Sequence, residues 1–168
     1  MLQPANPLLQ PWDTPFQLPP FDRIQAAHFA PAFEVAVREH AEEVAAIAAS
    51  PEAPTFDNTV AAFDRSGRRL TRIEQVFFNL ASSETSPALQ AVEREVAPKL
   101  AAHESAIYLD AKLFARVDEV HARRDALGLE DEQRRLLERI HLDFVLAGAR
   151  LGDAAKARLA QIVERLAQ

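Results

Sequence analysis

Five histidines are the side chains of this sequence best suited to metal chemistry. They are His28, His40, His103, His121 and His141. A helical zinc site of the His-Glu-x-x-His type needs two imidazoles four residues apart, so that both face one ion. No two of these histidines have that spacing, and the nearest match, His103-Glu104, has Ile107 where the second imidazole would stand. We therefore expect no zinc site of this type in the chain, and a His/carboxylate site assembled from distant residues is the alternative.

The sequence also lacks the residues that other common catalytic sites require. There is no cysteine, which excludes thiol nucleophiles, disulfides and cysteine-bound zinc. The four glycines are scattered, so they cannot surround a phosphate with backbone amides, and no Gly-x-Ser-x-Gly string is present. Neighbouring acids such as Glu42-Glu43 lie among charged residues, and we interpret them as solvated helix faces. The chain itself is therefore predicted to hold no catalytic residue and no cofactor.

One concentrated group of arginines stands out, formed by Arg65, Arg68, Arg69 and Arg72. On a continuous helix these positions make a single stripe. Such a stripe could grip a carboxylate or phosphate through paired hydrogen bonds, and it is our candidate for an anion or partner contact. The alternative is structural pairing with acids such as Asp64 and Glu74, or with another helix.

Length and charge narrow the class of protein. The chain has 168 residues and 18.6 kDa, which fits one domain. The net charge of −6 and the pI of about 5.4 argue against a general nucleic-acid binder. No stretch approaches the roughly 20 consecutive apolar residues of a membrane span. Since no basic-then-apolar leader follows Met1, the sequence is typical of a cytoplasmic protein without membrane contact.

Apolar side chains recur at helical spacing in six runs after Phe21, where alanine is the commonest residue. The runs begin near Phe29, Thr55, Ser86, Leu113, Glu130 and Asp153. Thr55 and Ser86 are predicted N-caps, and Asn58 stands in the capping-box position after Thr55. Gly67 predicts a bend or short break, and Pro98 predicts a kink or a division of the third helix. The pattern predicts an all-α fold of about six helices packed as antiparallel hairpins.

The start of the chain has a different composition. Six of the eleven prolines lie within the first 20 residues, so this stretch cannot be an α-helix. It also carries more large apolar side chains than a disordered tail would hold. We predict that residues 1–24 form an extended Pro-rich arm packed on the body, with Trp12 and Phe16 as anchors. Residues 25–168 would form the helical domain, and a flexible leader is the alternative for the arm.

The last predicted helix carries no stop signal. Its apolar stripe is still running at Leu166, and neither glycine nor proline follows. We therefore expect the helical domain to be truncated from a longer protein, although a frayed natural terminus would look similar.

Six strings, taken in order along the chain, carry a resemblance to a known family. They are Asn6-Pro7-Leu8-Leu9, Leu18-Pro19-Pro20-Phe21-Asp22-Arg23-Ile24, His28-Phe29-Ala30-Pro31-Ala32-Phe33, Pro54-Thr55-Phe56-Asp57-Asn58-Thr59, Val76-Phe77-Phe78-Asn79-Leu80 and Ile107-Tyr108-Leu109-Asp110. Their order and spacing resemble the N-terminal part of the thimet-oligopeptidase family of zinc metallopeptidases, in the branch of bacterial dipeptidyl carboxypeptidase and oligopeptidase A. The resemblance covers essentially the whole chain.

The resemblance implies a mostly helical protein several times longer than this chain, which cleaves short peptides in a channel between two lobes. It places zinc, a His-Glu-x-x-His helix and a downstream glutamate in the second half of that protein, so it assigns no catalytic or metal residue here. What it implies for this chain is a channel wall, whose partners are the C-terminal catalytic lobe and oligopeptide substrates. The isolated chain should then be inactive.

Two further points stay open at the level of sequence. The chain could instead be a free-standing helical interaction module or homodimer, and surface exposed by a missing lobe could also drive self-association. The sequence does not distinguish a peptidyl-dipeptidase from an endo-oligopeptidase.

Overall fold

The computed structural model describes residues 6–166, which form only helices and connecting turns. The α-helices are α1 (Phe29–Ala48), α2 (Ala62–Arg65), α3 (Arg68–Ser83), α4 (Pro87–Tyr108), α5 (Ala111–Ala122), α6 (Asp131–Leu146) and α7 (Asp153–Leu166). A π-helical turn, Phe56–Ala61, leads into α2. Short 3-10 turns cover Pro7–Leu9, Pro15–Gln17, Ala26–His28 and Arg124–Ala126. The predicted all-α class is confirmed.

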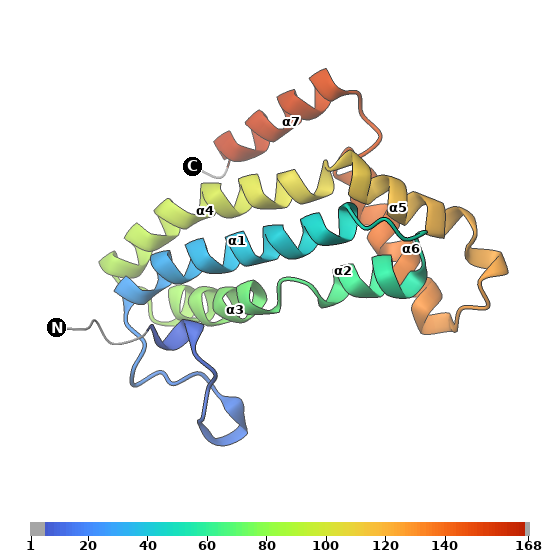
Figure 1. The fold of residues 1–168 in the computed structure, drawn as a ribbon. Coiled ribbons are helices and arrows are strands. Elements are labelled where there is room, and N and C mark those ends of the chain that lie inside the picture. Colours follow the sequence, from blue (N-terminus) through green and yellow to red (C-terminus); the bar gives the residue numbers. More distant parts are fainter. Residues whose placement is uncertain (1–5, 167–168) are drawn as a thin grey trace.

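Helix α1 lies at the centre of the assembly (Figure 1). Helices α3 and α4 both pack along α1, and α3 runs antiparallel to its two neighbours. At the far end of α1, α5 and α6 form a second antiparallel pair. Helix α7 returns along the outer side of α4, away from α1. The predicted antiparallel packing is therefore found for α1 with α3, α3 with α4, α5 with α6 and α4 with α7, whereas α5 continues in roughly the direction of α4.

Two apolar cores hold these helices together. The first surrounds Phe29, Phe33 and Phe77, whose rings meet edge to face with centroids 5.0 and 5.4 Å apart. The second lies between α5, α6 and the π-helical turn, around Phe144 and Leu137. The two cores are joined through α1, which contributes Phe29 to the first and Val44 to the second.

The predicted helix caps are confirmed. Thr55 Oγ1 accepts a hydrogen bond from the Asn58 amide at 3.1 Å, and Asn58 Oδ1 accepts from the Thr55 amide at 2.9 Å. Ser86 caps α4 ahead of Pro87, which occupies the first turn. These pairings satisfy amides that the first turn of a helix leaves without partners.

The second predicted helix is interrupted at Ser66-Gly67. Gly67 takes a left-handed conformation with φ of +68°, which L residues rarely adopt. Its amide donates to Glu43 Oε2 on α1 at 2.7 Å, so the break also ties the chain to α1. In contrast, α4 continues through Pro98 without division.

The Pro-rich arm is held to the body mainly by Leu8, which is fully buried in the first core. The Asn6 amide group donates to the carbonyl of His28 at 2.7 Å. Trp12 is half-buried, and its indole donates to the carbonyl of Pro7 at 3.1 Å. The prediction that Phe16 anchors the arm is wrong, because Phe16 is 95% exposed. It lies at the tip of a turn in which the Thr14 hydroxyl donates to the carbonyl of Leu18, which closes the tip on itself.

Within residues 6–166, no helix combines the length and apolar character needed to cross a bilayer.

Candidate functional site

The arginine group is divided by the break at Gly67. Arg65 lies on α2, whereas Arg68, Arg69 and Arg72 lie on α3, so the four side chains do not form one helical stripe. Arg69 Nη1 pairs with Glu39 Oε1 of α1 at 2.8 Å. Arg65 and Arg68 are exposed, and for these two an anion or partner contact stays a prediction.

Arg72 joins the arm to α3. Its Nη2 donates to the carbonyls of Leu8 at 3.2 Å and Gln10 at 3.3 Å. Its guanidinium also lies 4.4 Å from the ring centroid of Trp12, within the range of a cation–π contact. Burial, with a smaller contribution from Arg69, lowers the pKa of Arg72. These contacts hold Arg72 within the fold.

A groove of about 520 Å³ opens between α3 and α4. Apolar side chains from both helices line it, including Leu70, Leu100 and Ile107. Its polar lining residues come from α1, α3 and α4. They are His40, Thr71, Glu74, His103, Glu104 and Tyr108. This groove brings six polar side chains from three helices together, and it is therefore our candidate functional site.

Two histidines are hydrogen-bonded to each other at one end of the groove. His103 Nε2 lies 3.0 Å from His40 Nδ1, and His40 Nε2 lies 3.2 Å from the Ser66 hydroxyl. The Ser66 hydroxyl donates to the carbonyl of Phe63 at 2.7 Å. We therefore assign the proton of His40 to Nε2, so that His40 Nδ1 accepts from His103. Burial lowers the pKa of both imidazoles, which favours this neutral pair.

Carboxylates and a phenol lie further along the groove. Burial, reinforced by the nearby charge of Glu104, raises the pKa of Glu74. Burial likewise raises the pKa of Tyr108, with Asp143 and Glu104 adding to the effect. The groove thus combines an apolar surface with side chains that can form hydrogen bonds to a polar ligand.

A second pair of histidines connects α5 to α6. The rings of His121 and His141 are stacked, with centroids 3.8 Å apart and planes 3° apart. His141 Nε2 lies 2.9 Å from Asp118 Oδ1, and Arg150 approaches the same oxygen at 3.5 Å. The hydrogen bond from His141 lowers the pKa of Asp118, and burial lowers the pKa of His121. This cluster lies apart from the groove and links two helices of the second core.

The resemblance places its zinc site in another part of the longer protein and not among the described residues. Within residues 6–166, no three side chains of His, Asp or Glu are placed to hold one metal ion. The groove histidines face each other, and His141 is held by Asp118.

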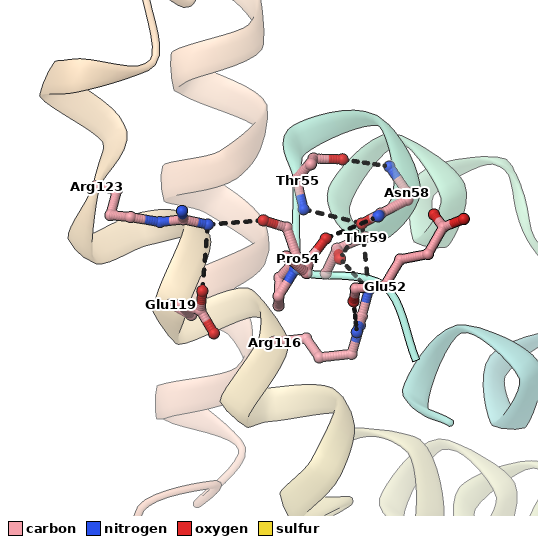
Figure 2. A network of polar contacts seen from close by, with 9 residues as sticks. Glu52, Pro54, Thr55, Asn58, Thr59, Arg116, Glu119 and Arg123 are labelled. Atoms are coloured by element: carbon pink, nitrogen blue, oxygen red, sulfur yellow. Dashed lines mark hydrogen bonds and ion pairs between the residues drawn. The ribbon is translucent and has the colours of Figure 1, made fainter. Parts of the chain in front are cut away.

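Arg116 is a buried arginine that the sequence did not lead us to single out. Two of its hydrogen-bond partners, Asn58 and Thr59, belong to the string Pro54–Thr59. Figure 2 shows Arg116 of α5 reaching into the loop before the π-helical turn. Its Nη1 donates to the carbonyls of Ser50 at 3.1 Å and Glu52 at 2.9 Å. Its Nη2 donates to the side chains of Asn58 and Thr59, each at 3.2 Å. Thus Asn58 serves both the helix cap and Arg116.

The sequence did contain a signal for this network. Arg116 falls in the apolar stripe of α5, between Leu113 and Val120, at a position that a core side chain would occupy. A charged residue there needs several partners, and the loop carbonyls supply them. Arg123 adds an outer contact in Figure 2, where it donates to the carbonyl of Pro54 at 2.7 Å and pairs with Glu119.

Comparison with known proteins shows relatives along almost the whole chain, although no protein-family model matches it. The chain is 46% identical over 155 residues to a dipeptidyl carboxypeptidase of Salmonella typhimurium. It is 44% identical over 154 residues to the dipeptidyl carboxypeptidase of Escherichia coli. Each match covers 92% of this chain and 23% of the relative. Oligopeptidase A of Escherichia coli is 26% identical over 164 residues, which are 98% of this chain and 24% of that protein.

The chain therefore spans about a quarter of the length of the relatives that it matches. Peptidases of two names, dipeptidyl carboxypeptidase and oligopeptidase A, match it over almost its whole length. The predicted resemblance to the N-terminal region of the thimet-oligopeptidase family is confirmed by these relatives.

Proposed function

We propose that this chain is the helical N-terminal part of a zinc-dependent peptidase that hydrolyses short peptides, and that it forms part of the channel wall without supplying a catalytic residue. The observation that supports the proposal most strongly is the 44–46% identity to two dipeptidyl carboxypeptidases over 92% of the chain. The zinc and the residues that bind it would lie in the remainder of the polypeptide.

The arrangement of α1, α3 and α4 suits a wall. Three helices of 16 to 22 residues lie side by side and share an apolar core that includes the rings of Phe29, Phe33 and Phe77. A close-packed core of this kind resists deformation. The groove between α3 and α4 would then present carboxylates and neutral histidines to a passing peptide.

The sequence identities favour a peptidyl-dipeptidase over an endo-oligopeptidase. The dipeptidyl carboxypeptidases are 44–46% identical to this chain, against 26% for oligopeptidase A. We accordingly propose that the whole protein releases dipeptides from the ends of peptides and does not cut within them.

The experiment has two parts. The reading frame beyond Gln168 should encode a His-Glu-x-x-His helix. The purified whole polypeptide should release dipeptides from test peptides with blocked and with free N-termini. A chelator should abolish this release, and added zinc should restore it. A frame that ends without such a helix, or a whole polypeptide that leaves the peptides intact, would contradict the proposal.

A further inference from the structure

The groove between α3 and α4 carries negative charge and no positive charge. Among residues 6–166, its charged lining residues are Glu74 of α3 and Glu104 of α4, and neither lysine nor arginine lines it. The His40–His103 pair adds no positive charge at neutral pH, because burial lowers the pKa of both imidazoles. An anion in this groove would meet two carboxylates and no cation. The lining therefore favours a positively charged ligand.

The carboxylate of Glu74 has no partner in the part of the chain that the structure describes. It is half-buried, and it forms neither an ion pair nor a hydrogen bond within residues 6–166. The neighbouring arginines of α3 are engaged elsewhere, since Arg69 pairs with Glu39 and Arg72 donates to the arm. A half-buried carboxylate gains more from a charged hydrogen-bond donor than a fully solvated one does.

Apolar side chains lie on both sides of this carboxylate. Leu70 and Phe78 stand one turn before and one turn after Glu74 on the same face of α3. Leu100 and Ile107 line the groove from α4. Phe78 is 41% exposed, so the face of its ring is available to a cation or to an apolar group. The ligand that fits this lining has a positive charge and an apolar body.

The size and the donor set of the groove favour an organic cation over a metal ion. Its volume of about 520 Å³ lies within the roughly 300–1,000 Å³ of small-molecule sites. Ca²⁺ takes about six to eight oxygen ligands. Within residues 6–166, by contrast, no three side chains of His, Asp or Glu are placed around one ion. The short side chains of Ala97 and Ala101 on α4 leave room for a larger, carbon-based body.

We propose that the groove between α3 and α4 is a binding site for a primary ammonium group on an apolar or aromatic body. The ammonium donates hydrogen bonds to the carboxylate of Glu74, with Glu104 as a second counter-charge, and the body lies against Phe78 and Leu100. A free amine and the N-terminus of a peptide with an apolar first residue share this chemistry. Only the peptide as the source of the ammonium rests on the proposed function.

Calorimetric titration of the whole polypeptide with phenethylamine tests the site. We expect a dissociation constant of about 1 mM or less. Phenethyl alcohol has the same body without the charge, and it should bind at least about tenfold more weakly. Glu74→Gln should weaken binding of the amine at least about tenfold. Glu104→Gln should weaken it by only about threefold, because Glu104 is exposed.

Glu93→Gln is the matched control. Glu93 is also half-buried and lies on α4, but outside the groove, so this variant loses the same charge and should keep the affinity of the wild type. Glu74→Gln should unfold at no lower temperature than the wild type, because it removes a half-buried charge that has no partner. The site would be overturned by a wild type that does not bind the amine, by equal affinities of the wild type and Glu74→Gln, or by equal affinities for the amine and the alcohol.

Two peptides identify the source of the ammonium. A tetrapeptide that begins with phenylalanine, with a free or an acetylated N-terminus, competes with phenethylamine in the presence of a chelator that stops hydrolysis. Displacement by the free form alone supports peptide N-termini as the ligand, and displacement by neither form supports a free amine. Equal displacement by both forms would contradict recognition of an ammonium group.

Peptide hydrolysis is measured separately on the zinc-supplied wild type. Binding of the amine without hydrolysis would contradict only the proposed function. Hydrolysis without binding of the amine would contradict only the ammonium site.

Discussion

Arg116 shows how much of the local structure one side chain can organise. It is only 8% exposed, and it donates to two loop carbonyls and to the side chains of Asn58 and Thr59. Its Nε is buried without a partner among residues 6–166, so its burial already carries some cost. The network therefore stabilises the fold only while the four hydrogen bonds from Nη1 and Nη2 of Arg116 are kept.

Arg116→Met should lower the free energy of unfolding by about 3 kcal/mol, because it leaves several buried acceptors without donors. Urea unfolding followed by circular dichroism measures this change. Arg123→Met is the matched control, since Arg123 also donates to the loop but is largely exposed. It should change stability by less than about 0.5 kcal/mol. Equal losses in the two variants would contradict the role of Arg116.

The His40–His103 pair predicts a dependence of stability on pH. Burial lowers the pKa of both imidazoles below the ordinary value, against a smaller opposite effect of Glu43 on His40. The unfolded chain then takes up protons at a higher pH than the folded chain. The stability that the neutral pair contributes is present above about pH 6.5 and is lost as the pH falls through the lower folded values.

Replacing both groove histidines with glutamine should flatten the loss of stability between pH 8 and pH 5. Thermal unfolding of the wild type and H40Q/H103Q across this range is the measurement. Because His121 has a lowered pKa as well, the variant should keep part of the slope. Parallel curves for the two proteins would show that the groove pair does not couple protonation to folding.

At the scale of elements, the arm depends on Leu8. Leu8→Ala should cost about 3 kcal/mol, because it leaves a cavity in the first core. Phe16→Ala removes a larger ring but should change the free energy of unfolding by less than about 0.5 kcal/mol, because the ring is exposed. Urea unfolding of the two variants compares them directly. If Phe16→Ala lowered the free energy of unfolding more than Leu8→Ala does, Phe16 would be the anchor, as predicted from the sequence.

The break between α2 and α3 depends on Gly67. A Cβ there would lie 2.9 Å from the His40 ring, in addition to the strain of a left-handed backbone. Gly67→Ala should therefore cost about 2 kcal/mol. Gly128 has a similar φ of +61° with open space around it, so Gly128→Ala isolates the backbone contribution and should cost about 1 kcal/mol. Calorimetric unfolding of both variants tests the difference, and an equal cost would show that the contact with His40 contributes nothing.

Local patterns predicted most of these elements. Apolar spacing and the caps at Thr55 and Ser86 placed the helices, because these signals act within a few residues. The wrong anchor at Phe16 and the missed role of Arg116 have another origin. Each depends on contacts between segments far apart in the sequence, as in the hydrogen bond from Arg116 to Ser50 across 66 positions. The groove was missed for the same reason, since it joins His40 to His103.

At the scale of the whole molecule, the proposed function makes this chain a supporting part of a longer polypeptide. Its helices share two cores, yet α7 and the end of α6 leave leucines uncovered. The matched relatives are more than four times as long as the aligned region. Both observations are consistent with the proposed function, in which the chain forms a wall beside a catalytic lobe.

The most direct test of the central claim is the activity of the chain by itself. Residues 1–168 are purified, supplied with zinc, and incubated with the peptides that the whole polypeptide cleaves. The account predicts no release of dipeptides at any zinc concentration, while the whole polypeptide hydrolyses the same peptides in parallel. Zinc-dependent cleavage by the purified chain would contradict the account.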